Sequence, residues 1–170
     1  TFPTAGINTT YSGDTLVTDS AAAGTALACG YKTNNGMISQ LPDGTNVKSL
    51  IECAEERGMG TGLITTTRIT HATPAVFASH NPDRNAENEI AADIAGSGVD
   101  FIAGGGIRHF VPQDWEWGSS KRTDDRNLLS EMSGQYHVYA SANETEDFLS
   151  YSPKGQEKAI ALFTSSHLHY

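Results

Sequence analysis

The chain contains a serine placed where a hydroxyl can act as a nucleophile. Ser20 lies between the β-prone run 15–18 and the alanine-rich run 21–28, a pattern typical of a strand, a sharp turn and a helix. The first N–H groups of a helix are unpaired and its dipole is positive there, so this position favours phosphate oxygens. Ala21 and the small residues after it leave room for a substrate, and Asp19 can hold an arginine or a metal ion. From these residues alone, a plain helix cap by Ser20 or Asp19 is the commoner explanation.

Strands and helices alternate along the rest of the chain. Apolar residues with helical spacing follow Asn46, which can cap that helix, and Gly58 can close it. The run 62–69 is rich in β-branched residues and follows closely, as the second strand of a βαβ unit would. Thr73 and Pro74 open another helix, as its cap and its first-turn proline. The predicted strands span 15–18, 62–69, 99–103, 135–139 and 159–163, and the predicted helices span 20–28, 47–57 and 87–94, with one more starting at Thr73.

This alternation predicts an α/β fold with a mostly parallel central sheet and helices on both faces. In such folds ligands bind at the carboxyl ends of the strands. Ser20, Thr73 and the glycine loop 104–106 all follow predicted strand ends. Residues 111–153 are more polar, which indicates a surface segment. We expect residues 1–170 to form a single domain.

The charge of the chain argues against a nucleic-acid partner. Its 20 acidic and 11 basic residues give a formal charge of −9, whereas nucleic-acid binding requires Lys and Arg to neutralise phosphates. A small anionic substrate would need local positive charge from metal ions, an arginine or a helix N-terminus. No apolar run approaches the roughly 20 residues of a membrane span, and the start of the chain has no signal-peptide pattern. Cys29 and Cys53 are expected as free thiols, with a disulfide as the less common alternative.

Four stretches of the chain carry a more specific signal than composition does. Residues 17–25, Val-Thr-Asp-Ser-Ala-Ala-Ala-Gly-Thr, resemble the nucleophile signature of the alkaline phosphatase family. Residues 30–36, Gly-Tyr-Lys-Thr-Asn-Asn-Gly, resemble the sequence that follows that signature. Residues 70–75, Thr-His-Ala-Thr-Pro-Ala, resemble the magnesium-site motif of the family, and the glycines 104–106 follow a strand. The resemblance covers most of the chain and favours Ser20 as a nucleophile over a plain cap.

The resemblance implies a metal-dependent phosphomonoesterase that acts through a covalent phosphoserine. Ser20 would attack phosphorus, and zinc and magnesium ions would be the cofactors. Ser20 and Thr73 would be metal ligands, Thr73 on magnesium, whose preference for hard oxygen ligands suits a hydroxyl. Asp19 would stand beside the nucleophile as a metal ligand or as a support for one, and Ala21 would adjoin the substrate. The alternative for Thr73 is a plain cap before Pro74.

Arg84 stands where the resemblance places the phosphate-clamping arginine, whose planar fork can hold two oxygens at once. The alternative is a solvated loop arginine paired with Asp83 or Glu87. Arg68 is a weaker candidate, since it lies within a strand-like run. His71 stands where family members carry an aspartate or a histidine near magnesium, and an imidazole suits a contact to water or phosphate better. The other five histidines have no ligand-like spacing and are predicted as surface or core residues: His80, His109, His137, His167 and His169.

The resemblance also implies what is missing. The zinc ligands of the family come from segments well before the nucleophile and well after the region that this chain resembles. Only 19 residues precede Ser20, so we expect a fragment of a longer enzyme, with little activity alone. The family further implies a small phosphate monoester as substrate, a homodimer and a periplasmic or extracellular location. A non-catalytic phosphate-binding or structural module is the alternative, and a serine esterase is disfavoured because Ser20 lacks the Gly-x-Ser-x-Gly motif.

Overall fold

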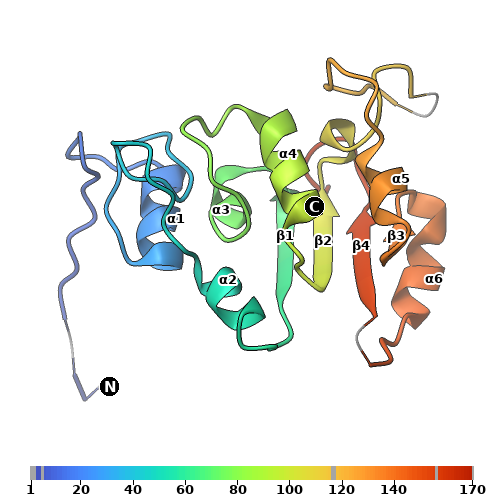
Figure 1. Cartoon of the computed structure of the whole chain (residues 1–170), viewed down its shortest axis with the longest axis horizontal. Helices are drawn as coiled ribbons and strands as arrows, with labels where there is room; N and C mark the ends of the chain where they lie inside the picture. Colours follow the sequence, from blue (N-terminus) through green and yellow to red (C-terminus); the bar gives the residue numbers. More distant parts are fainter. Residues whose placement is uncertain (1–2, 5, 116–117, 156, 170) are drawn as a thin grey trace.

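A four-stranded sheet forms the centre of the molecule (Figure 1). The computed structural model describes residues 3–4, 6–115, 118–155 and 157–169. The strands are β1 (Gly62–Arg68), β2 (Phe101–Gly105), β3 (Tyr136–Tyr139) and β4 (Lys158–Leu162). Their order is β1-β2-β4-β3, and every neighbouring pair is parallel. This arrangement confirms the predicted α/β fold with a mostly parallel sheet.

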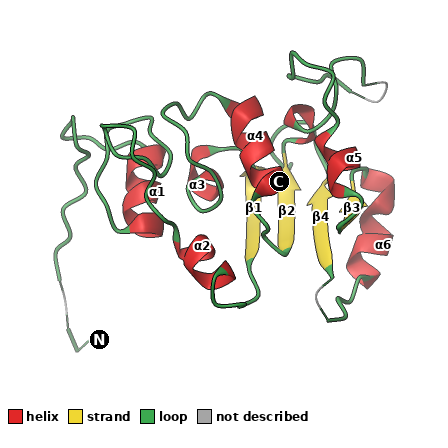
Figure 2. Ribbon diagram, viewed as in Figure 1, coloured by secondary structure: helices red, strands yellow, loops and turns green. Residues whose placement is uncertain are grey.

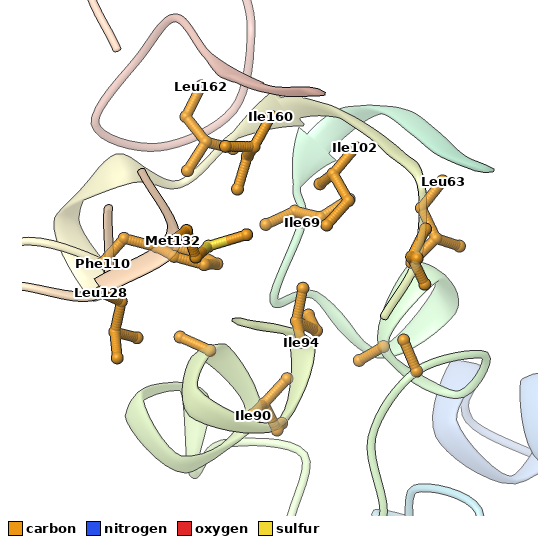
Figure 3. Packing of buried hydrophobic residues seen from close by; sticks show 14 of the residues in the cluster. Leu63, Ile69, Ile90, Ile94, Ile102, Phe110, Leu128, Met132, Ile160 and Leu162 are labelled. Atoms are coloured by element: carbon orange, nitrogen blue, oxygen red, sulfur yellow. The ribbon is translucent and has the colours of Figure 1, made fainter. Parts of the chain in front are cut away.

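Helices cover both faces of the sheet, as predicted (Figure 2). One face is covered by α4 (Glu87–Gly96) and α5 (Leu128–Met132). On that face Ile102 of β2 is fully buried together with Ile90 and Ile94 of α4 (Figure 3). Burial of one such side chain contributes about 1.5–3 kcal/mol, so this layer supplies much of the free energy of folding.

The other face carries aromatic side chains that pack against α6 (Thr145–Ser150). The ring centroid of Phe148 in α6 lies 5.9 Å from that of Phe101, 5.4 Å from that of Tyr139 and 5.2 Å from that of Phe163. Stacked and edge-to-face contacts of this kind stabilise a fold beyond the burial of the rings themselves. Because Phe101 and Tyr139 come from β2 and β3, α6 ties these strands to the end of β4.

Three helices lie on the β1 side of the sheet: α1 (Ser20–Cys29), α2 (Leu50–Glu55) and α3 (Ala72–Ala75), with α3 between α1 and β1 (Figure 1). α1 and α3 approach closely because Gly24 has no side chain. A Cβ at this position would lie 3.0 Å from Cγ2 of Val76. The close packing holds α1 near the segment that follows β1.

Residues 15–18 do not form the predicted strand. Leu16 is 90% exposed and Val17 is 81% exposed. Among the described residues this run has neither a neighbouring strand nor a core to pack on. β-branched residues favour a strand only where such a surface is available. The predicted strand before Ser20 is therefore wrong.

Two other predictions about element boundaries are also wrong. α2 begins at Leu50 instead of residue 47, and its cap is Ser49, which forms a reciprocal capping box, instead of Asn46. The capping box pairs two backbone N–H groups that the helix leaves free, so it decides where the helix starts. Gly104 and Gly105 belong to β2 instead of a loop, because β2 has pairing partners on both sides.

Only part of the polar segment 111–153 is exposed. Leu128 and Met132 of α5 are buried in the core, whereas residues 123–126 are exposed. Residues 116 and 117 of this segment lie outside the described residues. Two short 3-10 helices occur in or beside it, η1 (Ile107–His109) and η2 (Ala142–Glu144).

Neither a disulfide nor a membrane-spanning helix is present in the part of the chain that the structure describes. Cys29 and Cys53 are free thiols, as predicted. Cys29 Sγ donates to Ser39 Oγ at 3.3 Å, and burial raises the pKa of the Cys29 thiol. A thiol of this kind is a poor nucleophile at neutral pH.

Replacement of Gly105 by Ala is expected to destabilise the fold strongly. A Cβ at this position would overlap the carbonyl oxygen of Ser166 and lie 2.8 Å from Thr164 Oγ1. The obstructing oxygen belongs to the backbone, so the segment after β4 must move, and overpacking of this kind costs about 3 kcal/mol. Gly96→Ala is the matched control, since a Cβ there meets nothing within 4 Å. Urea unfolding measures both variants, and equal stability of the two contradicts the prediction.

Candidate functional site

Ser20 is the first residue of α1, and Asp19 caps that helix. Asp19 Oδ1 accepts the N–H of Ala22 at 2.9 Å, and the Asp19 carbonyl accepts the N–H of Ala23 at 3.0 Å. Because Asp19 provides the cap, the Ser20 hydroxyl is not needed for it. Ser20 is half-buried at the positive end of the helix dipole, where an anion is stabilised.

Arg84 reaches Ser20 from a loop 64 residues further along the chain. Its Nη1 donates to Asp19 Oδ2 at 3.0 Å and to Ser20 Oγ at 3.3 Å. The backbone N–H of Arg84 also donates to the carbonyl of Gly36 at 2.8 Å. The ion-pair partner of Arg84 is therefore Asp19, and its guanidinium is fixed beside the Ser20 hydroxyl.

The turn at Asn35 and Gly36 holds Asp19 in place. Asn35 Oδ1 accepts the backbone N–H of Asp19 at 2.9 Å, and the N–H of Gly36 donates to Asp19 Oδ2 at 3.0 Å. Asn35 Nδ2 also donates to the carbonyl of Val17 at 3.0 Å. Gly36 has a φ of 87°, which glycine adopts without strain. Neither residue was a predicted site residue, although the stretch 30–36 carried the family resemblance.

The Asp19 carboxylate is engaged by three donors of the protein. Burial alone would raise its pKa, but the N–H of Ala22, the guanidinium of Arg84 and the N–H of Gly36 together hold the pKa below its usual value. Asp19 is therefore ionised at neutral pH. Its charge and its two oxygens hold Arg84 and the start of α1 in one fixed arrangement.

His71 follows β1 and contacts Arg84. Its Nε2 lies 3.4 Å from Arg84 Nη2. Burial lowers the pKa of His71, and the positive charges of Arg84 and Arg68 lower it further. The imidazole is therefore neutral at neutral pH and can accept a hydrogen bond from Arg84. The structure thus brings four predicted site residues together: Asp19, Ser20, His71 and Arg84.

Thr73 does not cap α3, and the Ala21 side chain is buried in the core. The cap position of α3 is His71, because the chain stays extended up to that residue, with φ −65° and ψ 150°. The predicted cap at Thr73 is therefore wrong. Thr73 is exposed and lines a groove of about 450 Å³ beside β1, together with Leu50 and Phe77. Ala21 is fully buried, so its methyl group packs in the core and only its backbone can face a substrate.

Arg68 belongs to a second polar cluster. Its Nε and Nη2 donate to the two carboxylate oxygens of Glu87, each at 2.7 Å, and Thr70 Oγ1 donates to Glu87 at 2.6 Å. The Arg68 and Glu87 side chains are only 15% and 14% exposed. Burial raises the pKa of Glu87, but the hydrogen bonds from Arg68 and Thr70 outweigh it and lower the pKa to about 2. Arg68 therefore links the end of β1 to the first turn of α4.

His109 extends this cluster as a neutral residue. Burial lowers the pKa of His109 to about 4, against the opposite effect of Glu87. The 3.4 Å contact between His109 Nε2 and Glu87 Oε2 is therefore not an ion pair at neutral pH. His109 Nε2 accepts from Arg108 Nε at 3.1 Å, so Nδ1 carries the proton and donates to Asn88 Oδ1 at 2.8 Å. His109 is a core residue, one of the two predicted outcomes.

The described residues do not form a complete metal site. No group of three or more His, Cys, Asp or Glu side chains converges within 3–4, 6–115, 118–155 and 157–169. The carboxylate of Asp19 already accepts three hydrogen bonds. The predicted ligands Ser20 and Thr73 offer only hydroxyls, whereas zinc sites are built from thiolate, imidazole and carboxylate groups. The described residues therefore do not by themselves complete a zinc or a magnesium site.

Comparison with known proteins gives one consistent result. The family model of alkaline phosphatase matches residues 1–170. Alkaline phosphatase 3 of Bacillus subtilis is 40% identical over 142 residues, which cover 79% of this chain and 28% of that protein. The repressible alkaline phosphatase of Saccharomyces cerevisiae is 40% identical over 153 residues, which cover 85% of this chain and 27% of that protein.

Solved structures show the same relationship. Alkaline phosphatase from the Antarctic bacterium TAB5 is 34% identical with a TM-score of 0.80, and the match covers 95% of this chain and 44% of that chain. The Thermus thermophilus enzyme is 37% identical with a TM-score of 0.80, and the match covers 94% of this chain and 31% of that one. The chain thus spans less than half the length of these relatives. Its sequence and its fold both show that it belongs to the alkaline phosphatase family.

Proposed function

We propose that the polypeptide containing this chain hydrolyses small phosphate monoesters, with Ser20 as the nucleophile. One observation carries the proposal: Arg84 Nη1 lies 3.3 Å from Ser20 Oγ at the N-terminus of α1. The guanidinium and the helix N-terminus together supply the local positive charge that a phosphoryl group needs on a chain with a net charge of −9. Membership of the alkaline phosphatase family supports the same reaction.

The reaction proceeds in two displacements at phosphorus. The Ser20 hydroxyl loses its proton as its oxygen attacks the phosphorus atom, the bond to the leaving group breaks, and the leaving oxygen takes up a proton to give the alcohol. Water then attacks the phosphoserine, the Ser20–phosphorus bond breaks, and Ser20 regains a proton as inorganic phosphate leaves. Two easier steps replace one difficult hydrolysis. Arg84 holds the transferring oxygens in both steps, and the backbone N–H of Ala21 lies at the same helix end.

The described residues orient the Ser20 hydroxyl but do not remove its proton. Arg84 donates to Ser20 Oγ, and the Nε2 of His71 lies against Arg84. A serine hydroxyl is a weak nucleophile until a base or a metal ion activates it. The activating group therefore has to come from outside the described residues.

We propose zinc and magnesium as the cofactors of the longer polypeptide. A mutant of the TAB5 enzyme that is 35% identical to this chain has Mg bound in its M3 site. Metal ions in such a site polarise phosphate and activate a hydroxyl or a water molecule. Ser20 and the exposed Thr73 are the residues of this chain proposed to contact them, with Asp19 and His71 as supports. From the family we also propose a homodimer and a periplasmic or extracellular location.

Hydrolysis of 4-nitrophenyl phosphate at alkaline pH tests the proposal. With zinc and magnesium present, the 170-residue chain is expected to show little or no activity, because its described residues form no complete metal site. The longer polypeptide is expected to be active and to lose its activity with a chelator. Metal-dependent hydrolysis by the 170-residue chain alone would mean that these residues supply the metal ligands themselves, which contradicts the proposal.

A non-catalytic phosphate-binding module is the second candidate. It is favoured by the combination of Arg84 with a helix N-terminus and no metal cluster among the described residues. Phosphate binding that is insensitive to chelator, with no hydrolysis by the longer polypeptide, identifies this function instead.

A further inference from the structure

The segment after β4 crosses the ends of β2 and β1. The carbonyl of Thr164 accepts the N–H of Gly106 at 2.9 Å, and the N–H of Leu168 donates to the carbonyl of Thr66 at 2.9 Å. These bonds carry His167 to the end of β1, where it contacts Arg68, 99 residues away in the sequence.

His167 binds β1 where its pairing with β2 is irregular. The register of the two strands shifts between Ile64 and Arg68. The backbone N–H of Arg68 donates to His167 Nδ1 at 3.2 Å, and Arg68 Nη1 lies 3.0 Å from His167 Nε2. The tautomer of His167 decides which of these two contacts is a hydrogen bond. Because Glu87 fixes the guanidinium of Arg68, the ring of His167 rests on a rigid support.

The ring of His167 also packs against His71. The two ring centroids lie 5.7 Å apart with an interplanar angle of 74°, an edge-to-face arrangement. The His71 side chain makes no capping bond to α3. Its orientation is therefore set by the ring of His167 on one side and by Arg84 on the other, where Nε2 lies 3.4 Å from Nη2. Arg84 in turn contacts the Ser20 hydroxyl.

We propose that His167 is a positioning residue of the Ser20 site: its ring holds His71 in the orientation that supports Arg84. The inference rests on the proposed function, because it treats Arg84 as the residue that binds phosphate. A series of contacts runs from the Arg68–Glu87 pair through His167 and His71 to Arg84. Substitutions within such a series change the affinity for a ligand without touching it.

Two substitutions separate the ring contact from the hydrogen bond. His167→Asn keeps an acceptor for the N–H of Arg68 and removes the ring, whereas His167→Phe keeps a ring beside His71 and removes the acceptor. In the full-length polypeptide with its metal ions, we expect His167→Asn to raise the KM for 4-nitrophenyl phosphate and the Ki of inorganic phosphate about 3- to 10-fold, the range that an aromatic edge contact supplies. We expect His167→Phe to change either constant by less than about 2-fold, since the edge contact remains.

Controls distinguish positioning from a purely structural role. His169→Asn alters an exposed histidine two residues further along and is expected to leave the KM and Ki unchanged. If His167→Asn lowers the melting temperature but leaves the KM and Ki unchanged, the proposal is overturned. It is also overturned if His167→Phe weakens phosphate binding as much as His167→Asn does.

Calorimetric titration with inorganic phosphate in a Ser20→Ala background measures the affinity of the site for phosphate in the absence of catalysis. Addition of His167→Asn is expected to weaken phosphate binding about 3- to 10-fold there as well. Unchanged affinity overturns the inference, even where Ser20-dependent hydrolysis is present. Weakened affinity together with no Ser20-dependent hydrolysis supports the inference and overturns only the proposed function.

Discussion

Replacement of Ser20 by Ala is expected to abolish phosphoenzyme formation and to lower the kcat of the longer polypeptide by about 1,000-fold or more, because it removes the proposed nucleophile. The fold is expected to be unaffected. Asp19 provides the cap of α1, and the Ser20 hydroxyl accepts a 3.3 Å bond from Arg84 that water can replace. The change in the free energy of unfolding should stay within about 0.5 kcal/mol.

Acid quenching during turnover, followed by mass spectrometry of the peptides, locates the trapped phosphoryl group. Thr18→Ala is the matched control, since it removes a neighbouring hydroxyl that donates to the carbonyl of Asp19 at 3.1 Å. This variant is expected to keep both the phosphoenzyme and the activity. A phosphoryl group trapped on another residue, or a Ser20→Ala variant with full activity, would show that Ser20 is not the nucleophile.

Replacement of Glu87 by Gln is expected to lower the free energy of unfolding at neutral pH by about 3 kcal/mol. This magnitude follows from the pKa of Glu87, which falls from 4.5 to about 2 in the folded protein. The substitution leaves the guanidinium of Arg68, which is 15% exposed, without its counter-charge. Loss of one partner from a buried pair is costly for this reason.

The same cluster makes the fold sensitive to acid. Because folding depresses the pKa of Glu87, its stabilising contribution is present above pH 4.5 and is lost as the pH falls toward 2. His109 acts in the same direction, since its pKa falls from 6.5 to about 4 on folding. Between pH 6.5 and pH 4, His109 is protonated in the unfolded chain but not in the folded protein. The free energy of unfolding therefore already declines below pH 6.5.

Urea unfolding at pH 7, 5 and 3 measures this dependence. Glu89→Gln is the matched control, because Glu89 lies exposed in the same first turn of α4. Glu89→Gln should change stability by less than about 0.5 kcal/mol at every pH. The Glu87→Gln variant should show a smaller decline in stability between pH 5 and pH 3 than the unsubstituted protein. If the decline is as large in the variant, other carboxylates such as Asp19 are responsible for the acid sensitivity.

Local sequence was sufficient for the fold class and for several elements. The predicted strands 62–69, 135–139 and 159–163 correspond closely to β1, β3 and β4, and the predicted helix 87–94 corresponds to α4. β-branched runs and helical periodicity are properties of neighbouring residues, so they can be read without the rest of the fold. Element boundaries failed where a competing interaction decided them, as in the capping box at Ser49.

The run 15–18 shows the limit of propensity. Its residues favour a strand, yet Leu16 is 90% exposed and no strand pairs with this run in the described part of the chain. A strand is stable only when another strand or a core accepts it. The sequence near residue 16 carries no information about that partner.

The sequence by itself determined which residue stands at the start of α1, and its resemblance to the family singled out Arg84 as the candidate phosphate clamp. Only the tertiary structure decided how these residues meet: Arg84 reaches Asp19 across 65 residues and His167 reaches Arg68 across 99. The physical reason is that these contacts depend on the path of the chain around the ends of β1 and β2. Spacing along the sequence indicates which residues share a face of a helix or strand, but it does not indicate such a path. No sequence pattern therefore indicated that His167 lies beside Arg68 and His71.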